Sequence, residues 1–186
     1  LLFEYGCIAT GSIAEGQGML IWLAGDKNGV GSVYVTQGSS PTPISTKEVD
    51  LAIRGYSEVS DAIGFIYKEA GHVFYQLTFP TADVTWLADL TPNNGVVKWV
   101  NLEQLDGSRH IATCHTYWNQ QHLIGNRRAS VINNLSSEIL TEDGIAVHRS
   151  VQGPMLIKPA YNRFIVNNFE VNFQGGSGNS NNPGLV

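Results

Sequence analysis

The sequence lacks two features that mark large classes of protein: long hydrophobic runs and blocks of basic residues. No apolar run approaches the ~18 residues that a membrane-spanning helix needs. Lys and Arg together number 11 against 16 Asp and Glu, and no stretch concentrates them. A protein that grips nucleic acid through its phosphates would carry such a stretch. We therefore expect neither a membrane nor a specific nucleic-acid sequence among its partners.

Cysteine is scarce, and no secretion signal is visible. Cys7 and Cys114 are the two cysteines, and they could form one bridge, but a disulfide scaffold is denser in cysteine. We expect two reduced thiols in a protein assembled inside a cell. The first residues, LLFEYGCIATGSIAEG, contain no basic n-region. Because the chain begins without methionine and ends in the loop-like GGSGNSNNPGLV, we expect a fragment of a longer protein.

The short motifs of common enzymes and cofactor sites are absent. The sequence contains no G-x-S-x-G, no P-loop and no G-x-G-x-x-G. The glycines of TGSIAEG are better explained as turn residues than as a phosphate loop. The histidines show no i, i+4 spacing on a helix, and His110 and His115, five residues apart, point to opposite faces of a strand. We predict no cofactor and no metal site.

Carboxylates are scattered along the chain rather than paired. A glycosidase places two carboxylates on either side of one bond, whereas most acids here fall in predicted turns, where Asp is common for other reasons. The candidates are Asp61, Asp83, Asp89, Glu103, Asp106, Glu138, Glu142 and Asp143. No catalytic residue is predicted, and the protein is not expected to be an enzyme.

What the sequence does contain is a series of strand patterns separated by turns. In residues 61–90, a strand around Phe65 leads into the turn KEAG, where Gly71 suits a positive φ. HVFYQLTF then alternates, Pro80 ends it, and VTWLADL begins again. The pattern predicts a three-stranded antiparallel meander. His72 follows the turn and is assigned no chemistry.

The same plan occurs twice more, in MLIWLAGDKNGVGSVYVT and in RHIATCHTYWNQQHLIGNRRASVINNL, where NQQ is the predicted turn. Taking Ile21, Phe65 and Cys114 as equivalent points places the units 44 and 49 residues apart, which is in the range of propeller blades. A sandwich of meanders also fits. We predict an all-β fold, a partial β-propeller of antiparallel meander blades, because blades bury both faces and these strands carry large residues on both sides.

One short helix, near residues 46–54, is predicted in a connection between sheets. Ser45 and Glu48 have the spacing of a capping box. Val49 and Ile53 lie at helical spacing, and Gly55 is a suitable stop.

We assign residues 1–135 to propeller blades and residues 136–186 to further strands. The second segment contains an Asp143-Gly144 turn before the strand IAVHRSV, and a long alternating strand, YNRFIVNNFEVNF, with a phase slip near Asn167. These strands either close the propeller or open a C-terminal β domain, and the pattern fits both.

Three residues are candidates for an interface. Arg127 and Arg128 form the one basic pair, in a turn beside His122, where they would meet solvent, an acidic partner or phosphate. Trp118 is one of four tryptophans that recur roughly once per unit, which fits packing between blades better than a sugar platform.

Several of these segments together resemble a known family. They are SVYVTQGSSPTPISTKEVDLAIRGYS, GHVFYQLTFP followed by TWLADL, VVKWV, HTYWNQQHLIGN, EDGIAVHRSVQGPML and RFIVNNFEVNFQGG. They are similar to segments of the packaged-DNA stabilisation proteins of short-tailed phages, also called tail hub or head-completion proteins. The likeness runs from about Gly18 to Gly176, and SPTPIST before the helix is its most specific part.

This resemblance implies a virion structural protein, assembled in the host cytoplasm into the tail. It would be a β-propeller subunit of a homo-oligomeric ring below the portal, helping to seal packaged DNA in the head. Its expected partners are the portal or a portal adaptor, the tail needle and the tailspike. The family's signatures are structural, so no active-site residue carries over. Two alternatives stay open: a carbohydrate-binding or carbohydrate-cleaving propeller, and a generic bacterial scaffold propeller.

Overall fold

The computed structural model describes residues 6–25, 31–38, 40–93, 96–139, 141–142 and 144–146, with single residues at 150, 168 and 170. The chain divides into two units, residues 1–149 and 150–186. The named strands and helices all lie in the first unit. The predicted strand YNRFIVNNFEVNF falls largely outside the described residues.

The first sheet has a first strand that is broken in the middle. β1 and β2 both pair with the same edge of β3, and the 3₁₀ helix η1 separates them. β3 then pairs with β4, and β4 with β5, all antiparallel. The elements are β1 (Gly6–Cys7), η1 (Thr10–Ser12), β2 (Ala14–Gly16), β3 (Met19–Gly25), β4 (Val33–Thr36) and β5 (Thr42–Pro43).

The second sheet is a four-stranded antiparallel meander in the order β6-β7-β8-β9. It confirms the meander predicted in residues 61–90 and adds a fourth strand, VVKWVN. The strands are β6 (Ile63–Glu69), β7 (His72–Phe79), β8 (Val84–Asn93) and β9 (Val96–Asn101).

The third sheet is three-stranded in the order β10-β11-β12, and a short hairpin, β13-β14, follows it. The elements are β10 (Ala112–Trp118), β11 (Gln121–Asn126), β12 (Ile132–Leu135), β13 (Thr141–Glu142) and β14 (Ile145–Ala146). β14 begins directly after Gly144, which has a φ of 82°. Asp143, the other residue of the predicted turn, lies outside the described residues.

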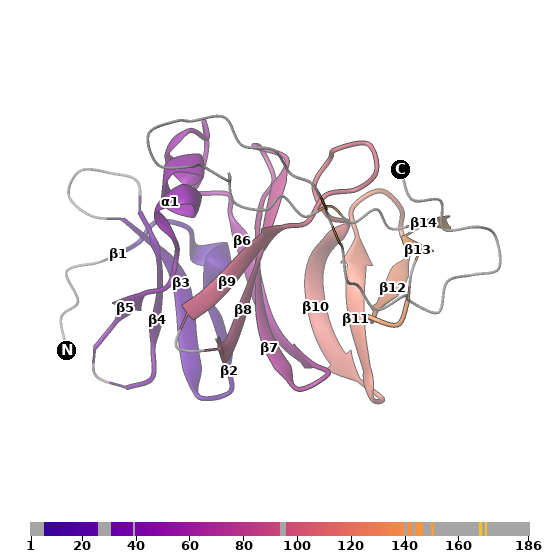
Figure 1. The fold of residues 1–186 in the computed structure, drawn as a ribbon, viewed down its shortest axis with the longest axis horizontal. Coiled ribbons are helices and arrows are strands. Elements are labelled where there is room, and N and C mark those ends of the chain that lie inside the picture. Colours follow the sequence, from indigo (N-terminus) through magenta and orange to yellow (C-terminus); the bar gives the residue numbers. More distant parts are fainter. Residues whose placement is uncertain are drawn as a thin grey trace. The chain divides into compact units, whose positions relative to one another are not determined.

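The three sheets lie side by side in the order of propeller blades (Figure 1). The first strands of successive sheets are neighbours, β2 with β6 and β6 with β10. The chain leaves each sheet from its last strand and enters the next at its first. This arrangement is that of a β-propeller segment. The three residues that were predicted to be equivalent do not all lie in corresponding strands. Ile21 lies in the second strand of its sheet, whereas Phe65 and Cys114 lie in first strands.

The central strand β7 is buried on both faces, as the propeller prediction requires. Tyr75, Leu77 and Phe79 belong to the large apolar cluster shared with the first sheet. Gln76 and Thr78, on the opposite face, are equally inaccessible. The third sheet contributes a much smaller apolar cluster of Ile111, Ala112 and Ile124, with Phe65 and Leu135 packed against it. The interface between the first two sheets is therefore apolar, and the interface between the second and third sheets is smaller and partly polar.

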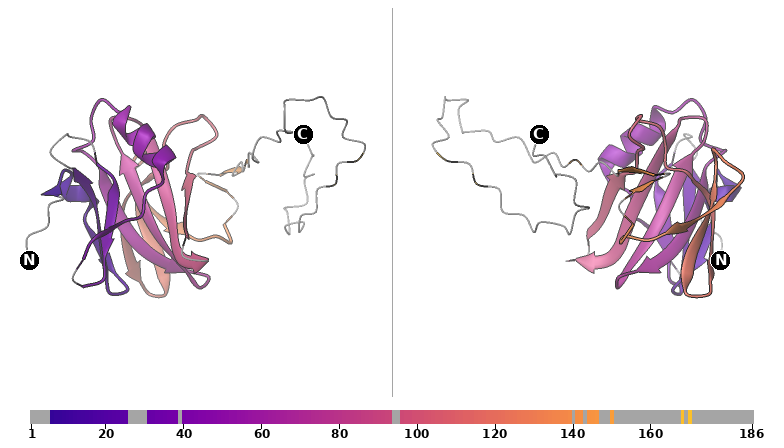
Figure 2. Two further views of the ribbon diagram at one scale, coloured as in Figure 1. Left: turned by 60° about the vertical axis from the view of Figure 1, so that its left-hand side comes forward. Right: turned by 90° about the vertical axis from the view of Figure 1, so that its right-hand side faces the viewer.

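Helix α1 (Lys47–Arg54) lies in the connection between the first and second sheets, at the end opposite the β6–β7 turn (Figures 1 and 2). The capping box prediction was wrong by one residue. Thr46 is the N-cap, its hydroxyl accepting from the Val49 N–H at 3.4 Å. The Ser45 hydroxyl instead accepts from the Val33 N–H at 2.9 Å. Gly55 ends the helix as predicted.

Two-residue turns join the first and second strands of all three sheets. Both residues of each turn have positive φ, the type I′ pattern that matches the twist of paired strands. The pairs are Gln17-Gly18, Ala70-Gly71 and Asn119-Gln120. Since the first strands run in the same sense, these turns gather at one end of the described sheets, the lower end in Figure 1. We call this the turn end.

Ala70 has a positive φ but is neither Gly nor Asn, the residues that favour this conformation, and this gives a stability prediction. Its φ is 49°, a region where a Cβ costs about 1–2 kcal/mol. Ala70→Asn is expected to raise the free energy of unfolding by about 0.5–1 kcal/mol, because Asn tolerates this region and Asn-Gly is a favoured type I′ pair. Urea denaturation measures the change. A midpoint at or below that of the parent protein would contradict the assignment of strain to this residue.

Candidate functional site

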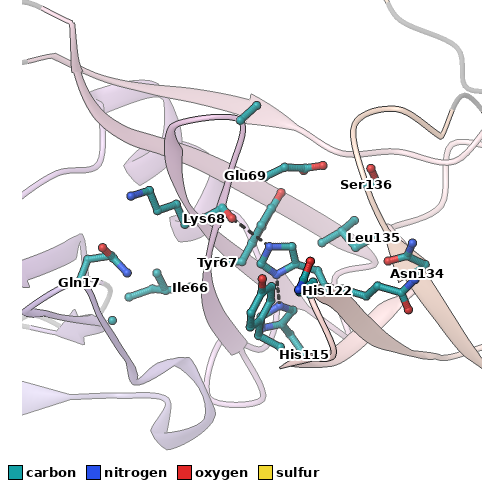
Figure 3. A pocket seen from close by; sticks show the side chains of 15 residues that line it. Gln17, Ile66, Tyr67, Lys68, Glu69, His115, His122, Asn134, Leu135 and Ser136 are labelled. Atoms are coloured by element: carbon teal, nitrogen blue, oxygen red, sulfur yellow. Dashed lines mark hydrogen bonds between the residues drawn. The ribbon is translucent and has the colours of Figure 1, made fainter.

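A pocket of about 610 Å³ opens at the turn end, between the first strands of the three sheets. Its lining includes Gln17 of the first sheet, Lys68 and Glu69 of the second, and His122 and Asn134 of the third. Figure 3 shows their side chains around a central pair of imidazoles. The pocket is mixed in character, with amides, aromatic rings and charged groups.

The imidazoles of His115 and His122 form a hydrogen-bonded chain that ends on the second sheet. His115 Nε2 lies 2.9 Å from His122 Nδ1, and His122 Nε2 lies 2.9 Å from the backbone oxygen of Lys68 (Figure 3). His115 also stacks on Phe65, with centroids 5.1 Å apart and planes at 13°. Burial and the adjacent His122 lower the pKa of His115 to about 4. His115 is therefore neutral at neutral pH.

The sequence pattern did not predict this pair, because the predicted turn was one residue too long. With NQQ as the turn, the strand would begin at His122. The structure has a two-residue turn, and Tyr117 faces His122 across the ladder. His115, two positions before Tyr117, then shares a face with His122. A shift of one residue in the register changes the face of the sheet on which a side chain lies. The correct turn length would therefore have predicted that His115 and His122 share a face.

The three predicted interface residues do not lie together. Trp118 ends β10 at the turn end and is 66% exposed. Arg127 and Arg128 follow the other end of β11. Arg127 is half-buried: its guanidinium donates to the Ser108 hydroxyl at 2.8 Å and lies 3.9 Å from the Asp83 carboxylate.

Arg128 is exposed and pairs with Asp106. Hydrogen bonds from Ser108 and from Arg128 hold the pKa of the Asp106 carboxyl well below its usual range. Both arginines thus have partners within the chain.

The remaining tryptophans pack as predicted. Trp22 is buried, and Trp86 and Trp99 pack against the large apolar cluster. Trp99 donates its indole N–H to the Ile44 oxygen at 2.8 Å, which ties β9 to the segment before α1.

His72 and the acids show local pairing rather than a catalytic arrangement. His72 Nδ1 lies 2.8 Å from an oxygen of Asp89. Burial opposes ionisation of Asp89, but hydrogen bonds from Thr91 and His72 outweigh it and lower the pKa. Asp61 accepts from the Thr81 N–H at 2.7 Å. Asp143 lies outside the described residues.

His110 sits between the second and third sheets, and it gives a pH prediction. Burial lowers its pKa from 6.5 to about 4. The unfolded chain binds this proton near pH 6.5 and the folded chain only near pH 4, so stability falls as the pH drops through that interval. Between about pH 7 and pH 5 the loss is on the order of 2 kcal/mol.

Urea denaturation at several pH values measures this dependence. His110→Gln is the matched variant, since glutamine does not titrate, and a flatter pH profile is expected from it. An unchanged slope in the variant would show that His110 does not carry the effect.

Among the described residues, no group of three or more His, Cys, Asp or Glu side chains is placed to hold a metal ion. Cys7 and Cys114 are both free and exposed. No helix in the described part of the chain is long and apolar enough to cross a membrane.

These features define a class of protein: an all-β propeller segment whose sheets are held by mutual burial. The comparison with known families is consistent with this class. The sequence model of the family described as "Bacteriophage P22 Gp10, beta-propeller" matches residues 1–140. The chain therefore belongs to this phage stabilisation family, and it is a virion structural protein of the head-completion, packaged-DNA stabilisation type. No curated protein matches the chain.

Proposed function

We propose that this chain is part of a tail hub subunit that sits below the portal, helps to seal packaged DNA in the head, and seats the tail needle and tailspikes. Membership of the phage stabilisation family is the observation that carries the proposal. The fold supports it, because both-face burial of β7 makes a stiff body with turns free at its ends. Identical subunits of this kind close into a ring through heterologous contacts.

The two ends of the third sheet are the proposed contact surfaces. At the turn end, Tyr117 and Trp118 are 60% and 66% exposed, and exposed aromatic residues of this kind are frequent anchors of protein interfaces. At the other end, Arg128 is exposed and available to an acidic group that competes with Asp106. A subunit that bridges portal-side and tail-side proteins needs two such surfaces on opposite ends.

The test is DNA retention in phage heads that lack the protein. Heads should package a genome and then lose it, and adding the purified full-length protein should restore retention. A portal-bound ring should be visible on restored heads by electron microscopy. Heads that retain DNA without the protein would overturn the sealing role. Restored retention with no density below the portal would overturn the hub position alone.

The turn-end pocket gives little support to a carbohydrate-cleaving propeller. Among the described residues, Glu69 is the only carboxylate that lines the turn-end pocket, whereas cleavage needs two across one bond. Trp118 is exposed but does not line that pocket. Binding to a glycan on an array that is lost in the Trp118→Ala variant would support this alternative.

A further inference from the structure

We propose that His115 and His122 form a two-histidine site for a divalent transition-metal ion that favours tetragonal coordination, Cu²⁺ or Ni²⁺. The site would lie in the turn-end pocket and take its remaining ligands from water. It is independent of the proposed virion role.

The hydrogen-bonding partner of His122 fixes which of its nitrogens is free to bind metal. The Lys68 backbone oxygen can only accept, so His122 Nε2, 2.9 Å away, carries the hydrogen. His122 Nδ1 therefore presents its lone pair to His115 Nε2 at 2.9 Å. A ligating histidine typically donates its other ring N–H to a backbone carbonyl in this way, which fixes the ring and its tautomer.

The spacing of the two nitrogens suits a metal ion in their place. With metal–nitrogen bonds of about 2.0–2.1 Å, two nitrogens 2.9 Å apart subtend roughly 90° at the ion, the cis angle of tetragonal Cu²⁺ and Ni²⁺ sites. A tetrahedral Zn²⁺ site would need them about 3.3 Å apart. The His115 ring has to turn about its Cβ–Cγ bond to direct its lone pair at the ion, while the hydrogen bond to the Lys68 oxygen keeps the His122 ring in place.

Metal binding requires one proton to move and no redox partner. In the metal-free protein, the His115 Nε2 hydrogen is shared with His122 Nδ1. On binding, His115 Nε2 releases its proton to water, Nδ1 of the same ring takes up a proton from water, and both imidazoles bind the ion as neutral ligands.

The surroundings hold the rings and leave room for the ion. His115 stacks on Phe65, and His122 contacts Tyr67 and Tyr117. The pocket lining contains one ammonium, Lys68, and one carboxylate, Glu69, so the charges nearest the ion largely offset each other. Both imidazoles line the pocket, where water can complete the coordination (Figure 3).

The experiment is a titration of tag-free, chelator-treated protein with CuCl₂, NiCl₂ and ZnCl₂ by isothermal calorimetry. One Cu²⁺ per chain should bind, more tightly than Ni²⁺, and Zn²⁺ should bind least well. His122→Asn keeps an amide donor for Lys68, and His115→Phe keeps the stack on Phe65. Each should weaken Cu²⁺ binding by at least about tenfold. His72→Asn is the matched control and should leave the affinity unchanged.

A second measurement uses the unaltered protein, in case a variant folds poorly. Substoichiometric Cu²⁺ should broaden the imidazole NMR signals of His115 and His122 before those of His72 and His110. Affinity unchanged in both variants, loss of affinity in His72→Asn, or equal broadening of all histidine signals would each overturn the proposal.

Discussion

Gly64→Ala is expected to lower the free energy of unfolding by about 3 kcal/mol, one of the largest effects of any single methyl group in the described sheets. A Cβ at this position would lie 2.7 Å from the Tyr75 hydroxyl, 2.8 Å from its ring and 2.9 Å from the Ser12 backbone oxygen. Tyr75 is fully buried and donates its hydroxyl to that same oxygen at 2.7 Å. The new methyl group would therefore push apart the bond that joins the first two sheets.

The surroundings leave little room for relaxation. The Ser12 hydroxyl donates to the Ala9 oxygen at 2.7 Å and accepts from the Leu23 N–H at 2.9 Å. These hydrogen bonds fix η1 against β3. Moving either the Tyr75 side chain or the backbone would therefore cost free energy.

Gly6→Ala is the matched control for Gly64→Ala, since no atom lies within 4 Å of a Cβ built on Gly6. It should change stability by less than about 0.5 kcal/mol. Denaturant unfolding of both variants measures the difference. Equal, small effects would mean that the first two sheets are not packed as described.

The second large effect concerns assembly. Tyr117→Ser combined with Trp118→Ser is expected to weaken binding to DNA-filled heads by about a hundredfold or more, because two exposed aromatic anchors are removed. Both side chains are more than half exposed, so the melting temperature should stay nearly constant. Sedimentation of labelled protein with heads measures the bound fraction.

Val100→Ser is the control for this assembly experiment, because Val100 is also exposed, at 49%, but lies on β9 of the second sheet. It should bind heads as the parent protein does. Full binding by the Tyr117 and Trp118 variant would show that the turn end of the third sheet is not a contact surface.

Much of the fold could be predicted from the sequence because each strand is delimited by turn residues. Gly71 and Pro80 bracket HVFYQLTF, and β7 runs from His72 to Phe79. The large residues on both faces of the strands led to the prediction of a propeller, and the family match agrees with that prediction.

The first strand of the first sheet could not be predicted. Its two pieces, β1 and β2, are only two and three residues long, too short for a period to be read. The residue that anchors the break, Ser12, is small and polar but fully buried. Its role depends on Leu23 and Tyr75, which lie far along the chain, so no local pattern records it.

The candidate site was hidden for two other reasons. The pairing of His115 with His122 depends on a turn length that NQQ leaves ambiguous. The ion pair of Arg127 depends on Asp83, which approaches from another sheet. Predicting contacts of this kind requires the alignment of neighbouring sheets as well as the register of the strands within each sheet.

Hydrogen exchange on the full chain tests most directly whether the second sheet is held between its two neighbours. The amides of β7, covered on both faces, should exchange only through global unfolding, while those of β11 and β12 should exchange through openings of lower free energy, because a smaller apolar cluster holds the third sheet. Slow exchange in β7 with faster exchange in β12 is the predicted result. Exchange of β7 as fast as that of β12, at a free energy below that of global unfolding, would contradict the account.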